Sequence, residues 1–210
     1  MVRSIIYDTL VAPLTASWYR EVLQRLSPGS RLLDIGIGTG AALSRNAELV
    51  RSAGIHVTGL DIDPEYVDRC RSRVRARGLA DRVQVHLRSV YDHEEGGFAA
   101  AYFSASFMLL PDPPGALRHV QRLLDPPGMV YFTQTFNEHR SKTLEALKPH
   151  LHRLTTVRFG RVTYPHEFFA VLTGAGLTVT ETLRLKSGLG GAARLIVARA
   201  QADSSSAVAS

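Results

Sequence analysis

The stretch RLLDIGIGTG at positions 31–40 constrains the fold more than any other part of the chain. Its first half is an apolar strand that runs directly into three glycines, Gly36, Gly38 and Gly40, spaced two residues apart. Glycine lets the backbone take a positive φ and lets a ligand lie against main-chain N–H groups with no Cβ in the way. The spacing therefore predicts a ligand-cradling turn, and Asp34 places a carboxylate just before it.

A second strand of the same kind follows the glycines. The apolar run 55–60 ends in another acid, Asp61. Two consecutive strand–helix units, each with chemistry at the end of its strand, are typical of one half of a nucleotide-binding sheet, where the second acid holds a ribose diol. The glycines alone do not choose the ligand, because Gly36, Gly38 and Ala41 also fit the G-x-G-x-x-G/A pattern of NAD-binding folds.

Length and composition favour one soluble domain. The 210 residues are 45% hydrophobic, which is enough for a single sizeable core. Polar Ser4 and Asp8 interrupt the first residues, and no apolar run reaches about 18 residues, so neither a signal peptide nor a membrane span is predicted. A cytoplasmic protein is expected. Cys70 is the only cysteine, which excludes an intramolecular disulfide and a thiolate metal cluster and favours a buried thiol.

The net charge of +6 raises the question of a nucleic-acid partner. Most basic residues are arginine, and five of them alternate between positions 69 and 77, within one predicted helix. Alternate positions spread around a helix, whereas a phosphate-tracking surface needs its charges on one side. A solvated helix face is therefore expected, without nucleic acid as a partner.

Hydrophobic periodicity predicts alternating helices and strands with short connections. Strands are expected at 31–35, 55–60, 82–87, 98–104, 129–135, 177–185 and 192–199, and helices at about 4–26, at 41–53, from Asp63-Pro64 onward, at 113–124 and at 165–174. Asp63 fits an N-cap and Pro64 the first helical position. The glycine-rich stretch 186–191 indicates a hairpin, which inserts an antiparallel strand into a parallel sheet. The polar tail 201–210 is expected to be disordered.

The order and spacing of these pieces resemble the class I S-adenosylmethionine-dependent methyltransferases. The segments that carry the resemblance are LLDIGIGTG, VTGLDIDPEY, FAAAYFSASFMLLPDPPGALRHVQRLLDPPGMVYFTQT and TGAGLTVTETL, and they cover nearly all of residues 20–200. The resemblance implies an α/β, Rossmann-like fold: a seven-stranded, mostly parallel sheet with an antiparallel last strand and helices on both faces. One domain, 1–200, is expected, with the cofactor over the carboxyl ends of the first, second and fourth strands.

Carried over by position, the resemblance implies a binding site for S-adenosylmethionine. Gly36, Gly38 and Gly40 would pass under the methionine part of the cofactor. Asp34 would act on its amino group, directly or through water. Asp61 would accept both ribose hydroxyls, because two donors on adjacent carbons match the two oxygens of one carboxylate.

The adenine end of that site is expected at three places. Ile62 would lie against one face of the ring, and Ser104 would contact the cofactor from the end of the fourth strand. The family often has Asp and then a small residue after the third strand, where this chain has Arg88, Ser89 and Val90. Ser89 and Val90 are expected to take that place, with the Ser89 hydroxyl as the hydrogen-bonding group.

The acceptor side is predicted from the residues after the fourth strand. The Asn/Asp-Pro-Pro-aromatic motif of many base methyltransferases is absent there, which lowers nucleic acid as a substrate. An apolar mouth with Phe107 and Met108 favours a small, partly apolar acceptor, although core positions are the alternative interpretation. Trp18 and Tyr19 are further candidates for substrate binding.

The N-terminal helical segment, about residues 1–26, is expected to provide a lid over the acceptor pocket. It carries aromatic residues, precedes the sheet and has no strand of its own, so it can exclude water around a sulfonium. A helix that merely covers the sheet is the alternative.

Methyl transfer from a sulfonium is an in-line displacement, so alignment and removal of water supply much of the rate and a dedicated base is optional. Tyr7 and His139 are nonetheless the candidate catalytic residues, with His150 and His152 as further histidines of the same insert. No metal is expected, because no paired His/Asp/Glu spacing occurs.

The sequence therefore predicts a methyltransferase for a small-molecule acceptor, with O, N or S as the accepting atom, acting as a monomer or homodimer. One alternative is an RNA or protein methyltransferase that uses its arginines to bind its partner. Another is a non-catalytic domain that keeps the fold for binding, against which the intact glycines and Asp61 argue.

Overall fold

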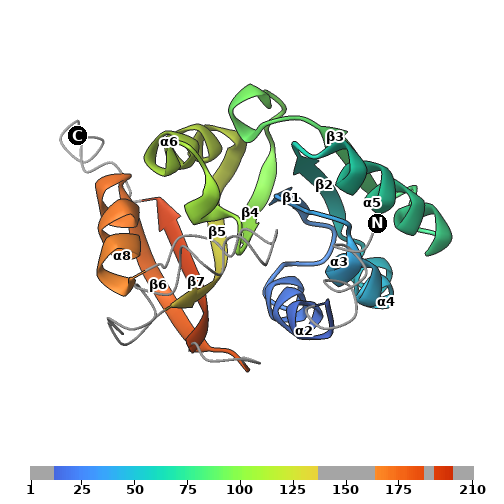
Figure 1. Ribbon diagram of the computed structural model, residues 1–210, viewed down its shortest axis with the longest axis horizontal. Helices are drawn as coiled ribbons and strands as arrows, with labels where there is room; N and C mark the ends of the chain where they lie inside the picture. The colour runs from blue at the N-terminus through green and yellow to red at the C-terminus, as the bar shows by residue number, and fades with distance from the viewer. Residues whose placement is uncertain (1–11, 137–163, 187–191, 201–210) are drawn as a thin grey trace, which may run out of the picture.

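The computed structural model describes residues 12–136, 164–186 and 192–200. Its strands are β1 Arg31–Ile35, β2 His56–Asp61, β3 Val83–Leu87, β4 Phe98–Ser104, β5 Leu124–Phe136, β6 Leu177–Arg184 and β7 Ala192–Ala200. They form one seven-stranded sheet in the order β3-β2-β1-β4-β5-β7-β6 (Figure 1). β1 to β5 pair in parallel, and β7 runs antiparallel to both of its neighbours. The predicted fold class is confirmed.

Helices cover both faces of the sheet, as predicted. They are α2 Ala12–Leu23, α3 Ala41–Arg45, α4 Ala47–Ser52, α5 Pro64–Ala76, α6 Pro113–Leu123 and α8 Pro165–Gly174, with two 3-10 turns, η2 Val90–Asp92 and η3 Phe107–Leu109. Side chains along β1 point alternately to the two faces of the sheet and so belong to two hydrophobic cores. Leu32 packs with α2 to α5, and Leu33 packs with α6 and α8. No helix in the described ranges is long and apolar enough to cross a membrane.

Helix α2 packs into the core with its aromatic residues. Tyr19 is buried, and so is Trp18, whose indole Nε1 donates a hydrogen bond of 2.9 Å to the Lys186 carbonyl. This burial favours the alternative of a covering helix for residues 12–19, and the lid stays a prediction. Residues 1–11 lie outside the described residues.

The predicted helix 41–53 is two helices, α3 and α4, that meet at Asn46. The buried Asn46 amide donates to the carbonyls of Ala16 in α2 and Ala42 in α3, each at 2.9 Å. One side chain thus binds carbonyls of two helices and ties α2 to the segment that follows the glycines.

Strand β5 begins earlier than predicted, at Leu124 rather than at residue 129. Leu124 already pairs with Phe98, and after an irregularity in the register Met129 pairs with Ala100. The Pro-Pro-Gly segment predicted to end α6 is therefore part of an irregular start of the strand.

Helix α5 begins as predicted, with Asp63 as its N-cap. The Asp63 carboxylate accepts the N–H groups of Glu65 and Tyr66, and Pro64 occupies the first turn. Two of the alternating arginines are tied to neighbouring backbone and do not simply face solvent. Arg71 donates to a carbonyl on β3, and Arg73 donates at 2.7 Å to the carbonyl of Thr39.

Candidate functional site

The loop between β1 and α3 takes the shape that its glycines predict. Gly36, Gly38 and Gly40 have φ values of 79°, 60° and 67°, a region that residues with a Cβ rarely adopt. The N–H of Gly36 donates to the Leu60 carbonyl at the end of β2, at 2.8 Å. The turn is therefore anchored to the neighbouring strand.

Close packing gives two of these glycines a second reason to be glycine. A Cβ on Gly36 would lie 2.6 Å from the Cβ of Ser106, and one on Gly40 would lie 2.5 Å from the Sγ of Cys70. A Cβ on Gly38 would meet no described atom within 4 Å. Gly36 and Gly40 thus seat the loop on its neighbours, whereas the main chain at Gly38 is open to a ligand.

Asp61 ends β2 and links the two loops of the site. Its Oδ2 accepts the N–H of Gly38 at 2.9 Å, and its Oδ1 accepts the N–H of Asp63 at 3.0 Å. Each carboxylate oxygen has a second lone pair, so the group can still accept two more donors. A vicinal diol supplies two such donors.

Asp34 is a fully buried acid in the middle of the sheet. Its Oδ2 accepts a hydrogen bond of 2.8 Å from the hydroxyl of Tyr19, while its Oδ1 is buried with no hydrogen-bond partner among the described residues. Burial raises the pKa of Asp34 from its ordinary 3.8 to about 7; the Tyr19 hydrogen bond lowers this pKa, and the charge of Asp61 raises it. A buried carboxylate with one oxygen that lacks a hydrogen-bond partner among the described residues is suited to bind a cation.

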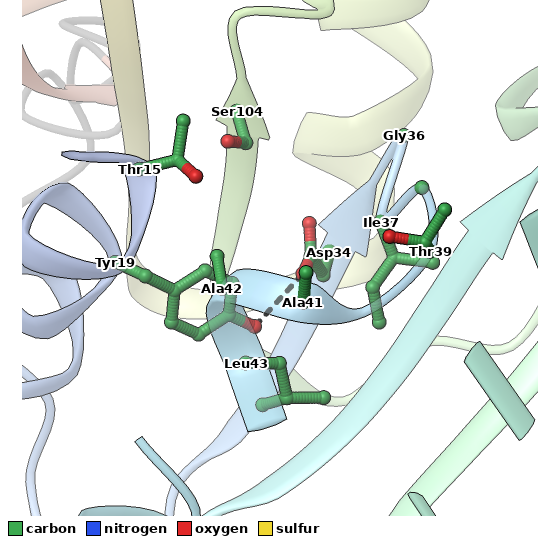
Figure 2. Close-up of a pocket in the computed structure, with 11 residues that line it drawn as sticks. Thr15, Tyr19, Asp34, Gly36, Ile37, Thr39, Ala41, Ala42, Leu43 and Ser104 are labelled. Carbon is green, nitrogen blue, oxygen red and sulfur yellow. Dashed lines mark hydrogen bonds between the residues drawn. The ribbon is translucent and has the colours of Figure 1, made fainter. Parts of the chain in front are cut away.

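A pocket opens beside Asp34, between α2, the glycine loop, α3 and the end of β4 (Figure 2). It is lined by Thr15, Tyr19, Asp34, Gly36, Ile37, Gly38, Thr39, Ala41, Ala42, Leu43 and Ser104. The structure thus brings together four of the predicted cofactor residues: Asp34, Gly36, Gly38 and Ser104. Figure 2 shows one oxygen of Asp34 bonded to Tyr19 and the other turned away from that bond.

The three residues predicted for the adenine end differ in their exposure and in their contacts. Ile62 is 76% exposed directly after Asp61, so its side chain is free to cover a flat ring. Ser89 caps η2, because its hydroxyl accepts the N–H of Tyr91 at 3.3 Å. Val90 is buried in the core with residues of α6, so its side chain faces the protein interior, and its contact with the cofactor stays a prediction.

Phe107 does not form an acceptor mouth. It is 1% exposed, and its ring centroid lies 5.2 Å from Phe103, 5.0 Å from Phe132 and 5.6 Å from Phe168. The η3 turn directs Phe107 inward and leaves Leu109 56% exposed. The prediction was wrong for Phe107, which is a core residue.

The other acceptor candidates divide between core, pocket and undescribed chain. Met108 is partly buried against the Phe107 core, and Trp18 is a core residue whose indole is already hydrogen-bonded. Tyr19 lines the pocket of Figure 2, but its hydroxyl is engaged by Asp34. The candidate bases Tyr7, His139, His150 and His152 lie outside the described residues. Within the described ranges no group of three His, Cys, Asp or Glu side chains is placed to hold a metal.

Sequence reasoning missed several residues of this pocket. Thr15 is one of them: it lies four positions before the predicted Tyr19 on α2 and shares its helix face, which was the available signal. Ser106 does not line the pocket but was also missed: its hydroxyl donates to the Ile35 carbonyl at 2.6 Å and joins the connection after β4 to the end of β1. No local pattern marks such a long-range contact.

The residues present fit the cofactor that the sequence predicts. S-adenosylmethionine carries an ammonium group, a sulfonium and a ribose diol. The idle buried oxygen of Asp34 suits the ammonium, the remaining lone pairs of Asp61 suit the diol, and the open main chain at Gly38 leaves room between them.

Several known proteins are similar to this chain in sequence. A family model described as a methyltransferase domain matches residues 8–182. The aklanonic acid methyltransferase DauC of Streptomyces sp. (strain C5) is 37% identical over 134 residues, which are 60% of this chain and 59% of DauC. The nocamycin O-methyltransferase of Saccharothrix syringae is 34% identical over 140 residues, 61% of this chain and 49% of that protein. The matched part thus spans about half the length of these relatives.

Solved structures share the fold. The [4+2]-cyclase SpnF has a TM-score of 0.70 at 19% identity, covering 88% of this chain and 81% of SpnF. A SAM dependent methyltransferase from Aquifex aeolicus has a TM-score of 0.67 at 18% identity, covering 87% of this chain and 88% of that one. At such identities the likeness concerns fold alone, but the family model covers most of the sequence. The chain belongs to the class I S-adenosylmethionine-dependent methyltransferases.

Proposed function

We propose that this protein binds S-adenosylmethionine in the pocket beside Asp34 and transfers its methyl group to a small-molecule acceptor. The observation that carries the proposal is the meeting of three features at one edge of the sheet. The first is the open turn at Gly38, and the second is the buried carboxylate of Asp34, of which one oxygen has no hydrogen-bond partner among the described residues. The third is the carboxylate of Asp61, which accepts N–H groups from the loops after β1 and β2. The relatives' names support the acceptor class, since one refers to aklanonic acid and another to nocamycin.

In the proposed mechanism the chain holds and aligns its ligands. When bound, the cofactor supplies an electrophilic methyl group on a positively charged sulfur. Asp61 binds the ribose hydroxyls and Asp34 binds the ammonium group. The turn at Gly38 lies against the part of the cofactor between these two groups. These contacts fix the direction of the methyl group, and in-line alignment lowers the barrier without a dedicated base.

The acceptor is proposed to approach from the carboxyl ends of β4 and β5. Ser104 ends β4 on the pocket wall, and exposed Leu109 with partly buried Met108 provides apolar surface on the connection that follows. Tyr7 and His139 are proposed on the acceptor side, with residues 1–11 closing over it. Oxygen, nitrogen and sulfur acceptors all fit this scheme.

We further expect no nucleic-acid partner, a cytoplasmic location, and a monomer or homodimer. Support for the first comes from the arginines of α5, since Arg71 and Arg73 are already bound to backbone carbonyls. An RNA methyltransferase would instead show binding to RNA that weakens steeply with salt.

Calorimetry with the purified protein tests the cofactor. S-adenosylmethionine and S-adenosylhomocysteine should bind, and NAD should not. Tight binding of NAD without a response to the methyl donor would overturn the assignment. Because the fold also serves a cyclase, transfer itself needs a separate test: a screen of small acceptors with radiolabelled methyl donor, with Asp61→Ala as the matched control. Label on RNA or protein alone would replace the proposed acceptor class.

A further inference from the structure

We propose, on the basis of the function proposed above, that Tyr19 is a positioning residue for the cofactor's ammonium group. Its hydroxyl fixes the Asp34 carboxylate so that the second oxygen faces the ligand, and it holds Asp34 in the charged form that an ammonium group requires. Affinity for the cofactor is then tied to pH through a residue on a helix outside the two strand–loop units of the site.

The geometry of the pair supports the positioning role. Tyr19 is 2% exposed on α2, and its hydroxyl reaches Oδ2 of Asp34 at 2.8 Å. The Tyr19 ring packs edge-on against Tyr102 at 5.2 Å between centroids, so it cannot swing away from the acid. With Oδ2 occupied, Oδ1 is the oxygen left for the ligand.

The electrostatic surroundings make the charge of Asp34 conditional. The titratable groups around it are Tyr19 on α2, Asp61 on β2 and Cys70 on α5, with Tyr102 as its partner in register on β4. Each of them is an acid or a neutral donor. Burial therefore raises the pKa of Asp34 to about 7, and the charge of Asp61 acts in the same direction.

Tyr19 is the group that opposes this effect. Its hydrogen bond lowers the pKa of Asp34, because a donor stabilises the carboxylate more than the neutral acid. Burial and the charge of Asp34 raise the pKa of Tyr19 well above its ordinary value, so Tyr19 keeps its proton and remains a donor. Loss of the hydroxyl should leave Asp34 neutral at pH values where the wild type carries a charge.

The consequence for binding follows from the fraction of protein with Asp34 ionised. Near pH 6 about one site in ten carries the charge, so the apparent affinity for a ligand with an ammonium group should fall about tenfold relative to pH 8. A ligand that lacks the amino-acid part should show no such dependence.

The test measures dissociation constants by calorimetry between about pH 6 and about pH 8. The probes are S-adenosylhomocysteine and 5′-methylthioadenosine, which lacks the ammonium group. Wild type should lose about tenfold in affinity for the first toward pH 6 and keep its affinity for the second. Tyr19→Phe should shift the midpoint of the S-adenosylhomocysteine curve to higher pH. At high pH its affinity should approach that of wild type. Asp34→Asn should bind weakly, with a flat curve.

Tyr102→Phe is the matched control. It also removes a buried tyrosine hydroxyl of the same cluster, one that is hydrogen-bonded to Thr133 at 2.8 Å, so the midpoint should move much less than in Tyr19→Phe. A Tyr19→Phe curve that is parallel to wild type, or a flat wild-type curve, would overturn the inference and leave the proposed function intact. Failure of wild type to bind S-adenosylhomocysteine at any pH would overturn the proposed function itself.

Discussion

Replacing Asp34 by asparagine should stabilise the ligand-free protein at neutral pH, even though we propose that the same change weakens cofactor binding. Asparagine keeps the shape of the side chain and still offers Tyr19 an oxygen acceptor, but it cannot ionise. In the unfolded chain Asp34 has its ordinary pKa of 3.8, whereas burial raises the folded value to about 7. The folded protein therefore binds more protons than the unfolded chain between these two pH values.

The sign and size follow from linkage. Where the folded state binds more protons, the free energy of unfolding falls as pH rises, so wild type loses stability relative to Asp34→Asn across this window. Each pH unit between the two pKa values contributes 1.36 kcal/mol, which gives a loss of about 4 kcal/mol that is complete above pH 7. Below pH 3.8 both chains are neutral at this position, and the difference between them should be small and constant.

Urea unfolding of both proteins at a series of pH values measures this difference. Pairwise comparison cancels every titration that the two chains share. Asp68→Asn on α5 is the control, because it removes one charge from an exposed side chain. A wild-type-minus-variant difference that changes by less than about 1 kcal/mol between pH 4 and pH 8 would refute the assignment of Asp34 as a strained buried acid.

Three further predictions test the rest of the site. Asp61→Ala should weaken S-adenosylhomocysteine binding by roughly 2–4 kcal/mol in calorimetry, because charged hydrogen bonds contribute about 1.5–3 kcal/mol each and share a desolvation cost; unchanged affinity would point to Asp63 instead. The same variant should also melt at a lower temperature, because two backbone N–H groups lose their acceptor. Gly40→Ala should lower the free energy of unfolding by roughly 1–3 kcal/mol through its positive φ and its contact with Cys70. The same change should cost less in a chain that already carries Cys70→Ala, and an equal cost in both backgrounds would refute the contact. A chain lacking residues 1–11 should fold and bind cofactor but lose turnover, and full activity would contradict the proposed lid.

The limits of helices and strands can be predicted where residues near in sequence determine them. Apolar runs bounded by glycine and proline placed β1 and β4 at their observed limits, and Asp63-Pro64 marked the start of α5. The cofactor residues could be grouped because carboxyl ends of neighbouring parallel strands meet at one edge, which brings Asp34 and Asp61 together from separate strands.

Contacts between distant segments are the part that sequence does not encode locally. Asn46 has the appearance of an ordinary helix residue in the sequence, but in the structure it stands at the break between α3 and α4 and bonds Ala16 in another helix. Phe107 reads as a member of an apolar run, and the direction of a 3-10 turn decides that it faces the core. The bond between Tyr19 and Asp34 depends on how α2 crosses the sheet, which no spacing predicts.

The aromatic cluster around Phe107 sets a rule for redesigning this protein. Phe107 contacts three other phenylalanines, from β4, β5 and α8, directly beneath the connection that follows β4. Emptying such a position costs about 3–5 kcal/mol, a large share of the stability of a domain. Variants made to probe the proposed acceptor site should therefore keep this aromatic cluster intact and change Met108 and exposed Leu109, which lie at the edge of the core.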